Sequence, residues 1–542
     1  MIENRPPSTT PLPTTGSQQT ASRRPAADPG GDQSEALGFL NDPASYGAAV
    51  TEVQRIDTHG AMVFLAGDRA YKIKRAVHYP YMDFSTLEKR HRACARELAL
   101  NVRTAPTLYR KVIAVTRNKD GILSFGGGGT PVEWVLVMKR FKQEQLLSNI
   151  AAAGGLTDEI ARDLADTVAA FHHTAPPPSD DTLKGAESIE WVVVENNQEL
   201  AEREDLFPPV QAARLAELSL DQLARRWALL DSRSESGLLR FCHGDLHLRN
   251  VVLLDGRPTL FDAIEFNDAI ACIDVFYDLA YLLMDLEHRG LRPLANLVLN
   301  RYLQKHDDLE ALSLLPLFLS ARATVRAKVA ASLEKIEDDG QAINERRDEA
   351  LSYFNEALRF LSPPPPRLVA VGGLSGSGKT SLAQALAPAL GAAPGAVHLR
   401  SDVLRKTLAG VDEAVRLPPS AYSREAGQAV YDSMLAKAGR VLAAGHSVVI
   451  DGVFARPEER AAAEALAHSS GAAFAGFWLQ ADPEILTSRV EQRRHDASDA
   501  TAAVVRQQLI YDLGDVDWTP IDAGASIKAV ADQARRLLNL PD

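Results

Sequence analysis

Two stretches of the sequence, far apart in the chain, carry side chains whose types and spacing suit phosphoryl transfer from a nucleotide. The first stretch places Asp245 five positions before Asn250, directly after a histidine and a glycine. A carboxylate can accept the proton of an attacking hydroxyl, and carboxylate or amide oxygens are ligands that Mg2+ prefers. The second stretch, residues 373–380, reads Gly-Leu-Ser-Gly-Ser-Gly-Lys-Thr and matches loops that bind nucleotide phosphates. Each stretch therefore predicts its own site for ATP chemistry.

The loop at residues 373–380 has the context that phosphate binding requires. An apolar run at 368–371 predicts a buried strand before it, and a helix is expected over 381–390 after it. Glycines let backbone N–H groups turn toward phosphates, the lysine meets the β and γ phosphates, and the threonine hydroxyl can bind Mg2+. The alternative is a glycine-rich turn that binds nothing. We expect ATP binding by the following residues, the last of which is also a metal ligand: Gly373, Ser375, Gly376, Ser377, Gly378, Lys379 and Thr380.

Two further acids follow predicted strands in the same region. Asp402 comes after the strand predicted at 397–399, and Asp451 ends the strand predicted from 447. Because the carboxyl ends of strands in a doubly wound sheet line the ligand crevice, we expect Asp402 to act as a base and Arg405 to hold the acceptor. Asp451 is expected to lie near the metal ion. The alternative role for Asp402 is a helix N-cap, and the two roles are compatible.

Two arginines are expected to close over the phosphates of the second site. Arg489 and Arg493 follow a predicted strand at 474–479 and stand four positions apart, so both lie on one face of a helix. Such a pair predicts a lid that contacts the nucleotide. The alternative is a solvated helix face, which is the more frequent origin of such arginines.

A hairpin is expected to complete the first site. Two apolar runs between residues 251 and 261 flank an Asp-Gly dipeptide, which is a strong turn signal. Folding of this hairpin brings Asn250, before its first strand, beside Asp262, after its second. We therefore expect Asp245 to be the base, and Asn250 and Asp262 to be metal ligands. The alternative is a loop with a structural role only.

A lysine and a glutamate upstream are expected to anchor ATP at the first site. Extended patterns between residues 62 and 74 predict two adjacent strands, with Lys72 and Lys74 on one face. Lys72 is preferred because it follows two apolar residues. In the helix expected next, Glu97 is preferred over Glu88 as its ion-pair partner, because Glu97 lies between apolar residues. Lys74 stays open as the anchor, and each of these side chains could instead be a solvated surface group.

Changes in composition and in residue pattern along the chain predict four segments. Residues 1–35 are rich in proline, threonine, serine and glycine and are expected to lack structure. Residues 36–361 combine extended patterns with later helical periodicity, which predicts an α+β domain of two lobes. The prolines of residues 362–366 predict a semi-rigid spacer. Residues 367–542 alternate strands and helices, which predicts an α/β domain with a doubly wound parallel sheet.

Bulk properties exclude several classes of protein. At 542 residues the chain exceeds one hydrophobic core, so at least two domains are expected. No apolar run reaches the roughly 18 residues that a membrane helix needs, and no secretory signal is evident. The formal charge of −12 argues against a protein that coats nucleic acid, and the three cysteines form no disulfide or zinc pattern. We therefore expect a cytoplasmic protein that has no membrane partner and does not coat nucleic acid; nucleic acid as a small-footprint substrate stays open.

Residues 367–542 resemble the small-molecule P-loop kinases, in the neighbourhood of gluconate kinase, chloramphenicol phosphotransferase and zeta-toxin-like kinases. The resemblance rests on the phosphate loop, the strand that ends at Asp451, the arginine-bearing segment and two short motifs: Asp402-x-x-Arg405 and Asp496-x-Ser498-Asp499. It implies a compact ATP-dependent kinase domain. The reaction is better identified than the acceptor, because members of this group differ widely in substrate.

Residues 40–350 resemble the aminoglycoside phosphotransferase and choline kinase-like branch of the protein-kinase fold. The resemblance rests on the 243–250 motif with its hairpin, on the helix start at 273–280, and on Asp262-Ala263-Ile264 in place of Asp-Phe-Gly. It implies the same base, metal ligands and ATP anchor as those expected above. No glycine-rich nucleotide loop is evident in this region.

The two regions in this order resemble a bacterial family described as bifunctional and of undefined substrate. The leading hypothesis is a kinase with two sites, each of which transfers the γ-phosphate of Mg-ATP to a hydroxyl of a small molecule. One alternative is a single catalytic kinase domain regulated by an ATP-sensing second domain. Another is a kinase that acts on protein or on a nucleotide-sugar. The sequence leaves the acceptors and the oligomeric state open.

Overall fold

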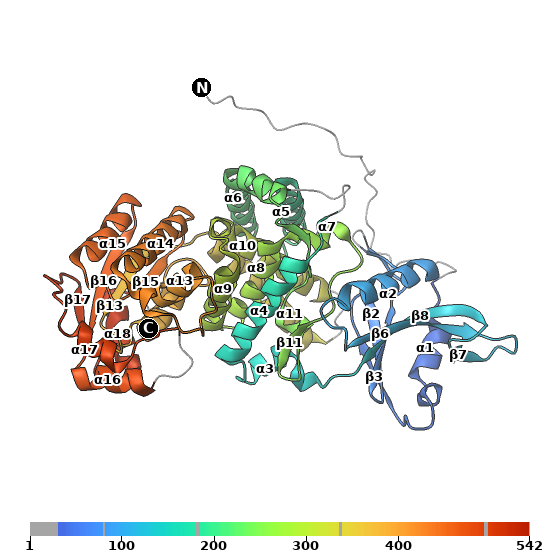
Figure 1. The fold of residues 1–542 in the computed structure, drawn as a ribbon. Helices are drawn as coiled ribbons and strands as arrows, with labels where there is room; N and C mark the ends of the chain where they lie inside the picture. The colour runs from blue at the N-terminus through green and yellow to red at the C-terminus, as the bar shows by residue number, and fades with distance from the viewer. Residues whose placement is uncertain (1–30, 80–81, 179–184, 335–338, 493–496, 541–542) are drawn as a thin grey trace. The chain divides into compact units, whose positions relative to one another are not determined.

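The computed structural model describes residues 31–79, 82–178, 185–334, 339–492 and 497–540, which form two compact units (Figure 1). The first unit contains the residues up to 102 together with 106–140, and the second contains 103–105 and 141–542. Within the described ranges, no helix combines the length and the apolar character that crossing a bilayer requires.

The first unit is built on an antiparallel six-stranded sheet. In spatial order its strands are β1 (Val53–Asp57), β2 (Ala61–Ala66), β3 (Arg69–Lys74), β8 (Thr130–Lys139), β6 (Tyr109–Arg117) and β7 (Leu123–Phe125). The unit also contains α1 (Ser34–Asn41), α2 (Leu87–Asn101), and the short strands β4 (His78–Tyr79) and β5 (Met82–Asp83). Alternate residues of the strands, such as Phe64, Ile73 and Val115, share one buried cluster. The two strands and the helix expected between residues 62 and 101 are confirmed.

Helix α1 begins inside the segment expected to lack structure. Gln33, directly before the helix, is buried, and its side-chain amide donates to Lys74 O (2.8 Å) and to Glu133 Oε2 (2.7 Å). These bonds attach the start of α1 to β3 and β8, so the last two residues of the expected tail are helical. Composition alone could not show this attachment. The rest of the tail prediction, for residues 1–30, lies outside the described residues.

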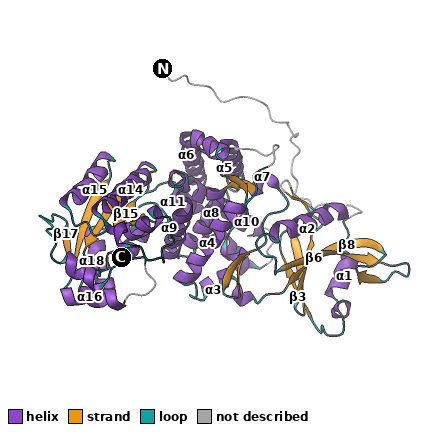
Figure 2. Cartoon of the chain, in the orientation of Figure 1, coloured by secondary structure: helices purple, strands orange, loops and turns teal. Residues whose placement is uncertain are grey.

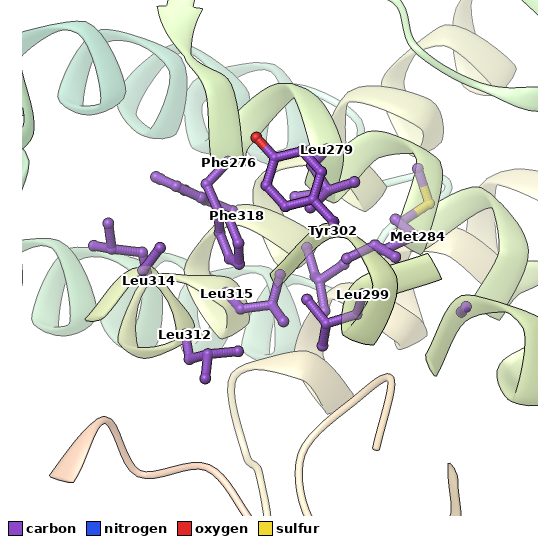
Figure 3. Packing of buried hydrophobic residues seen from close by; sticks show 14 of the residues in the cluster. Phe276, Leu279, Met284, Leu299, Tyr302, Leu312, Leu314, Leu315 and Phe318 are labelled. Atoms are coloured by element: carbon purple, nitrogen blue, oxygen red, sulfur yellow. The ribbon is translucent and has the colours of Figure 1, made fainter. Parts of the chain in front are cut away.

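The first part of the second unit is mostly helical (Figure 2). Its helices are α3 (Leu147–Ala152), α4 (Asp158–Thr174), α5 (Ala186–Ala201), α6 (Pro209–Glu235), α7 (Asp268–Ala271), α8 (Val275–His288), α9 (Arg292–His306), α10 (Leu315–Glu334) and α11 (Gly340–Phe360). Its strands pair as β10 (Val251–Leu254) with β11 (Arg257–Leu260), and as β9 (Leu239–Phe241) with β12 (Cys272–Asp274). Helix α8 is buried on nearly every side, because apolar residues of α9, α10 and the turn before α10 pack around it (Figure 3).

The rest of the second unit contains a parallel five-stranded sheet. Its spatial order is β14 (Val397–Arg400), β15 (Val448–Asp451), β13 (Arg367–Gly373), β16 (Ala473–Gln480) and β17 (Thr519–Asp522). Its helices are α12 (Lys379–Leu386), α13 (Ser401–Leu408), α14 (Arg424–Ala443), α15 (Pro457–Ser469), α16 (Pro483–Gln492), α17 (Ala502–Gln508) and α18 (Ile527–Leu537). Val369 and Val371 of β13 pack with α12 and α18, whereas Leu368 and Ala370 belong to the cluster that includes α14 and α15. Helices thus cover both faces, which confirms the doubly wound sheet (Figure 1).

The two parts of the second unit pack together, although the prolines of residues 362–366 predict a spacer between them. Apolar residues from both parts belong to one buried cluster. Beside the edge strand β14, Asn296 Nδ2 of α9 donates to Ala396 O (2.9 Å), and Arg292 Nε donates to Pro388 O (2.6 Å). These side chains satisfy backbone carbonyl groups close to the edge strand that would otherwise be left to water. The prolines restrict only their own backbone, so they do not prevent this packing.

Candidate active sites

In the first unit, Lys72 and Lys74 both form ion pairs with Glu97. Lys72 Nζ lies 2.8 Å from Glu97 Oε1, and Lys74 Nζ lies 2.5 Å from Glu97 Oε2. Apolar residues of β3 occupy the opposite face of the sheet, so both lysines point toward α2, which carries Glu97. The Lys72 side chain is 12% exposed, whereas that of Lys74 is 4% exposed. The expected Lys72–Glu97 pair therefore forms, with Lys72 the more accessible of the two lysines.

A second buried ion pair holds α2 against the sheet. Arg90 Nε lies 3.0 Å from Glu133 Oε2 on β8, and both side chains are almost completely buried. Arg90 NH1 also donates to Phe84 O (3.1 Å). Removing either member of a buried pair leaves an uncompensated charge, which is strongly destabilising. This pair therefore couples the position of α2, and with it Glu97, to the sheet.

In the second unit, residues 243–250 form a loop that ends in the 3-10 turn η3 (Leu248–Asn250). Asn250 Nδ2 donates to Asp245 Oδ2 (2.8 Å), and His247 Nε2 lies 3.3 Å from the same oxygen. The expected base and an expected metal ligand are therefore in direct contact. His247 had no role in the sequence prediction, and its place two residues after Asp245 is the signal that could have found it.

The hairpin of β10 and β11 places Asp262 next to Asn250, as the sequence predicts. Phe261 N donates to Asn250 O (3.0 Å), which continues the strand pairing to the end of the hairpin. Its turn is made by Asp255 and Gly256, both at positive φ, as a two-residue hairpin turn requires. Asp262 has a φ of 63°, in the left-handed region that is costly for residues other than glycine. Such strained positions are concentrated at functional sites.

Charged side chains outside the predicted site hold this loop against the helical core. Asp278 of α8 accepts hydrogen bonds from His243 N (3.0 Å) and from Gly244 N (2.9 Å). Asp285, two turns later on α8, accepts a hydrogen bond from the N–H at the start of η3 (2.9 Å). Arg322 of α10 donates to Gly244 O (3.1 Å). The buried helix α8 therefore positions the loop at both ends, and of these residues the sequence indicated only the helix start around Asp278.

The environment of Asp245 favours its ionised form. Desolvation raises the pKa of its carboxyl group, but the neighbouring His247, Arg326 and His243 outweigh this effect, so the pKa lies well below its usual range. An ionised carboxylate is the form that can accept a proton from a hydroxyl.

The predicted phosphate loop connects β13 to α12 and borders a cavity of about 2000 Å³. The loop residues that line this cavity are Ser375, Gly376, Gly378, Lys379 and Thr380. Gly373 and Ser377 are buried behind them. The predicted loop residues therefore divide into a group that faces the cavity and a pair that supports it.

The shape of this loop depends on its glycines. Gly376 and Gly378 have φ values of 86° and 89°, which residues with a side chain rarely adopt. A Cβ atom at Gly376 would also overlap Leu486 O. Lys379 Nζ lies over the loop and donates to Leu374 O (2.9 Å).

Helix α12 differs from its prediction at both ends. It begins at Lys379 rather than at residue 381, so its N-terminus lies directly at the loop. It ends at Leu386, and the 3-10 turn η5 (Ala387–Ala389) follows. Pro388 lacks an N–H, which ends the α-helical pattern before the expected limit at residue 390.

Asp451, Thr380 and His398 meet at the carboxyl ends of the strands. Thr380 Oγ1 lies 3.4 Å from Asp451 Oδ1, and His398 Nε2 lies 2.6 Å from Asp451 Oδ2. Desolvation raises the pKa of Asp451, but His398, Arg400 and Lys379 together bring it below its usual value. An ionised carboxylate beside a hydroxyl is an oxygen donor set that suits Mg2+. The sequence placed His398 in a strand but did not show that it reaches this carboxylate.

Asp402 lies in the first turn of α13, but it is not the N-cap. The N-cap position is occupied by Arg400, so the capping alternative is not supported. Burial raises the pKa of Asp402 above the ordinary carboxyl value; Asp451 adds to this, while a hydrogen bond with Ser498 opposes it. Arg405 follows one turn later, and both residues line the cavity.

Asp499 connects three segments around the cavity. It accepts hydrogen bonds from Lys406 Nζ (2.8 Å), Leu417 N (3.0 Å) and Tyr422 OH (2.6 Å). Lys406 is almost completely buried, so this ion pair is shielded from water. The sequence motif contained Asp499, but its role in joining these segments is visible only in the structure.

The two arginines expected to form a lid have different outcomes. Arg489 lies on α16 and lines the cavity. Helix α16 ends at Gln492, and Arg493 lies outside the described residues. The lid therefore stays a prediction.

Two protein-family descriptions match the chain. Residues 89–315 match the phosphotransferase enzyme family, and residues 368–511 match an AAA domain. The first match contains the Asp245 loop, and the second contains the phosphate loop with Asp402. These matches indicate transfer of a phosphoryl group from a nucleotide.

The chain is also similar to proteins along most of its length. Uncharacterized proteins of Mycobacterium tuberculosis and Mycobacterium bovis are 33% identical to it over 489 residues, which cover 88% of this chain and 94% of theirs. A solved sugar kinase from Janibacter sp. is 21% identical, with a TM-score of 0.25, and covers 32% of this chain and 96% of its own. An ethanolamine kinase from Plasmodium vivax is 12% identical, with a TM-score of 0.35, and covers 57% of this chain and 82% of its own. The chain therefore belongs to the same family as these mycobacterial proteins, and it is a kinase that joins a phosphotransferase-family domain to a P-loop domain of the AAA type.

Proposed function

We propose that this kinase has two catalytic sites, each of which transfers the γ-phosphate of Mg-ATP to a hydroxyl of a small molecule. The proposal is carried by one observation: each part of the second unit has its own candidate base close to its own oxygen donors. Asp245 contacts Asn250 in one part, and Asp402 lines the same cavity as Thr380 and Asp451 in the other. The two sets share no residue.

At the first site, Asp245 accepts the proton of the acceptor hydroxyl. Asn250 and Asp262 supply the oxygen atoms that hold Mg2+, and the strained backbone of Asp262 fixes where its carboxylate is presented. Lys72, kept in place by Glu97, contacts the α and β phosphates. The metal ion, when bound at either site, neutralises charge on the phosphate oxygens.

At the second site, Lys379 and the N–H groups of the loop bind the nucleotide phosphates, and Thr380 and Asp451 hold Mg2+. Asp402 takes the proton from the acceptor, and its raised pKa makes it a stronger base than an ordinary carboxylate. The remaining roles are those expected from the sequence: acceptor binding by Arg405, and phosphate contact by Arg489 and Arg493.

A second candidate function is a single catalytic domain regulated by ATP at the other. It is favoured by α9, which lies in the phosphotransferase-family domain and reaches the P-loop domain. Asn300 of α9 accepts a hydrogen bond from His398 N (2.7 Å), and His398 contacts Asp451. If this contact has two arrangements that differ in their affinity for the nucleotide, ATP binding at one site would change the other site. A kinase that acts on protein or on a nucleotide-sugar is a further alternative.

Consumption of ATP by the full chain tests the proposal. Asp245→Asn, Asp402→Asn and the double variant are compared with sugars, nucleosides, amino alcohols, aminoglycosides and peptides as acceptors. Two active sites predict that each single variant loses transfer to one acceptor by roughly 10²- to 10⁴-fold and keeps transfer to another. If either single variant abolished all transfer while ATP binding persisted, the regulated kinase would be favoured instead.

We also propose that the protein acts on small molecules in the cytoplasm. ATP is the phosphate donor, and Cys94, Cys242 and Cys272 are buried and form no disulfide in the described structure, as suits a reducing compartment. Cell fractionation of the full chain carrying a C-terminal tag tests the location. Recovery mainly outside the cytoplasmic fraction would contradict it.

A further inference from the structure

The carboxylates that line the cavity of the P-loop site are already engaged by other groups of the protein. Their partners are side chains or backbone N–H groups of the protein, and of these acids only Asp451 is assigned to a cation, the Mg2+ ion of the proposed function. The pairs are Asp158 with Arg162, Asp402 with Ser498, Asp412 with Ala414, Glu413 with Arg301, Asp451 with His398, Glu459 with the N–H of Arg456, Asp499 with Lys406, and Asp512 with Gly514.

The arginines of the same cavity include five that have no carboxylate within ion-pair distance in the part of the chain that the structure describes: Arg405, Arg416, Arg424, Arg456 and Arg489. Arg405 NH1 donates to Ala421 O (2.7 Å), and its guanidinium lies 4.8 Å from the ring of Tyr422. Its Nε is buried and has no hydrogen-bond partner among the described residues. In a chain with a net charge of −12, five arginines without an ion-pair partner among the described residues therefore line one cavity.

The nucleotide accounts for only part of this positive charge. In the proposed function, the ATP phosphates contact Lys379, the loop N–H groups and Arg489. The other four arginines lie on segments that follow β14 and β15. Asp402 comes two residues after β14, and Asp451 ends β15. Guanidinium groups suit phosphate and carboxylate because they donate two parallel hydrogen bonds.

We propose that the acceptor of the P-loop site carries an anionic group, a phosphate or a carboxylate, which is bound by Arg405, Arg416, Arg424 and Arg456. The inference rests on the proposed function of this site. The acceptor hydroxyl oxygen forms a bond to the γ-phosphorus, the bond between that phosphorus and the bridging oxygen breaks to release ADP, and the hydroxyl proton passes to Asp402. An arginine cluster of this kind also rejects cationic acceptors through repulsion between like charges.

Acceptors that differ in the anionic group test this inference. In the full chain with Asp245→Asn, ATP consumption is measured with glucose, gluconate and glucose 6-phosphate, and with adenosine and adenosine monophosphate. Binding of inorganic phosphate and of citrate is measured by calorimetry on the chain saturated with a non-hydrolysable ATP analogue. Arg424→Gln combined with Arg456→Gln should weaken binding of at least one of these anions by about tenfold or more. Arg536→Gln, an exposed arginine of α18 outside the cavity, should leave it unchanged.

The outcomes separate the inference from the function on which it rests. The probe that responds identifies phosphate or carboxylate as the bound group. Two results would overturn the proposal of an anionic acceptor while the proposed kinase activity of this site stands. One is Asp402-dependent transfer that is equal for neutral and anionic acceptors. The other is anion binding that the double variant leaves unchanged. Absence of Asp402-dependent transfer to every acceptor would refute the proposed function itself. Equal melting temperatures of the variants exclude loss of folding as the cause.

An independent observation connects the phosphotransferase-family domain to the P-loop site. Asn300 of α9 accepts a hydrogen bond from His398 N (2.7 Å), and its Nδ2 donates to Ala396 O (3.2 Å). The same His398 places its ring nitrogen 2.6 Å from Asp451 Oδ2. One helix side chain therefore holds the backbone at His398, which contacts the expected metal ligand, and at Ala396, two residues before it.

The next residue of α9, Arg301, reaches another side of the same cavity. It donates two hydrogen bonds to Asp166 of α4 (2.7 and 2.8 Å) and one to Glu413 (2.6 Å). Glu413 lies in the segment between α13 and α14, where Leu417 N is bound by Asp499. Arg301 therefore ties this segment to two helices of the phosphotransferase-family domain.

The geometry points to Asn300 and Arg301 as positioning residues of the P-loop site, which act through His398 and Glu413. The P-loop site is then complete only when α9 is in place. A helix that merely covered the sheet edge would stabilise the fold but would not change the dependence of ATP binding on Mg2+.

The dependence of ATP binding on Mg2+ distinguishes residues that position the P-loop site from residues that only stabilise the fold. In the full chain with Lys72→Ala and Lys74→Ala, binding of a fluorescent ATP analogue is titrated against Mg2+. Asn300→Ala should raise the Mg2+ concentration for half-maximal binding roughly threefold to tenfold, with binding in the absence of Mg2+ unchanged. Arg301→Ala should lower Asp402-dependent ATP consumption, and Arg301→Lys should restore part of it. Lys305→Ala, on the exposed side of α9, is the control. Equal loss of binding with and without Mg2+, or no loss at all, would overturn the inference.

Discussion

At the scale of single residues, the two candidate bases have opposite electrostatic surroundings. Cationic neighbours outweigh the desolvation of Asp245 and keep its pKa low, whereas burial and Asp451 raise the pKa of Asp402. Each base works only when ionised, so activity is lost as the pH falls through its pKa. The acid limb of the P-loop reaction should therefore lie at a higher pH than that of the other reaction. The rate of transfer is measured against pH for Asp245→Asn and Asp402→Asn, since each variant reports the activity of the remaining site. If the P-loop reaction lost activity at the lower pH, the prediction would be contradicted.

The roles at the first site differ in what each side chain touches. Asp245→Asn should abolish transfer with little effect on Mg-ATP affinity, because a base contacts the acceptor. Asp262→Asn should also weaken Mg-ATP binding, because a metal ligand acts on the nucleotide through its ion. Mg-ATP affinity and melting temperature of both variants are the measurements. If Asp245→Asn weakened Mg-ATP binding as much as Asp262→Asn, this division of roles would be wrong.

A buried histidine near the sheet edge makes stability depend on pH. Burial lowers the pKa of His446 from 6.5 to about 4, against the opposing effect of its hydrogen bond to Gly395 O (2.7 Å). The unfolded chain then binds the proton first as the pH falls below 6.5, so stability decreases between pH 6.5 and 4. From pH 7 to 5 this loss amounts to about 2 kcal/mol. Urea unfolding at both pH values should show a smaller loss for His446→Gln, and an equal loss would show that other groups are responsible.

At the scale of elements, the phosphate loop depends on backbone geometry more than on side chains. Gly376→Ala should remove nucleotide binding at the P-loop site, because its positive φ and the nearby Leu486 O leave no room for a Cβ. Gly439→Ala, in α14, is the matched control: a Cβ there would lie 3.5 Å from Leu466, an ordinary contact. The control should stabilise the helix by up to about 1 kcal/mol. Calorimetric titration with ATP measures nucleotide binding by both variants. Undiminished binding by Gly376→Ala would contradict the assignment of this loop to nucleotide binding.

At the scale of the whole molecule, the second unit contains the candidate catalytic loop at residues 243–250 and the entire P-loop domain. Because their apolar residues form one cluster, variants of the full chain are better tests than separated domains. The full chain should bind two equivalents of ATP. Lys379→Ala should bind one, and so should Lys72→Ala combined with Lys74→Ala. Equilibrium dialysis counts the equivalents, and loss of both after Lys379→Ala alone would refute two independent sites.

The sequence by itself determined what depends on neighbouring residues. Strand alternation, the Asp-Gly turn and the glycine pattern act over a few residues, so they predicted β2, β3, the hairpin and the strand and helix that flank the loop at 373–380 correctly. The hairpin even predicted a tertiary fact, the proximity of Asn250 and Asp262, because a two-residue turn leaves one register. Helix limits were less accurate, as α12 shows, because caps and prolines decide them locally.

Only the tertiary structure decided how charged residues support these motifs. Asp278 binds the loop 35 residues before it, and Asn300 binds His398 98 residues after it. Whether such a side chain is solvated or buried depends on which helix packs against it, and that follows from the apolar contacts of whole elements. Composition predicted a spacer at the prolines, but α9 packs beside the P-loop sheet. The sequence could not show this packing, because the free energy of covering an edge strand is gained only when both parts are folded.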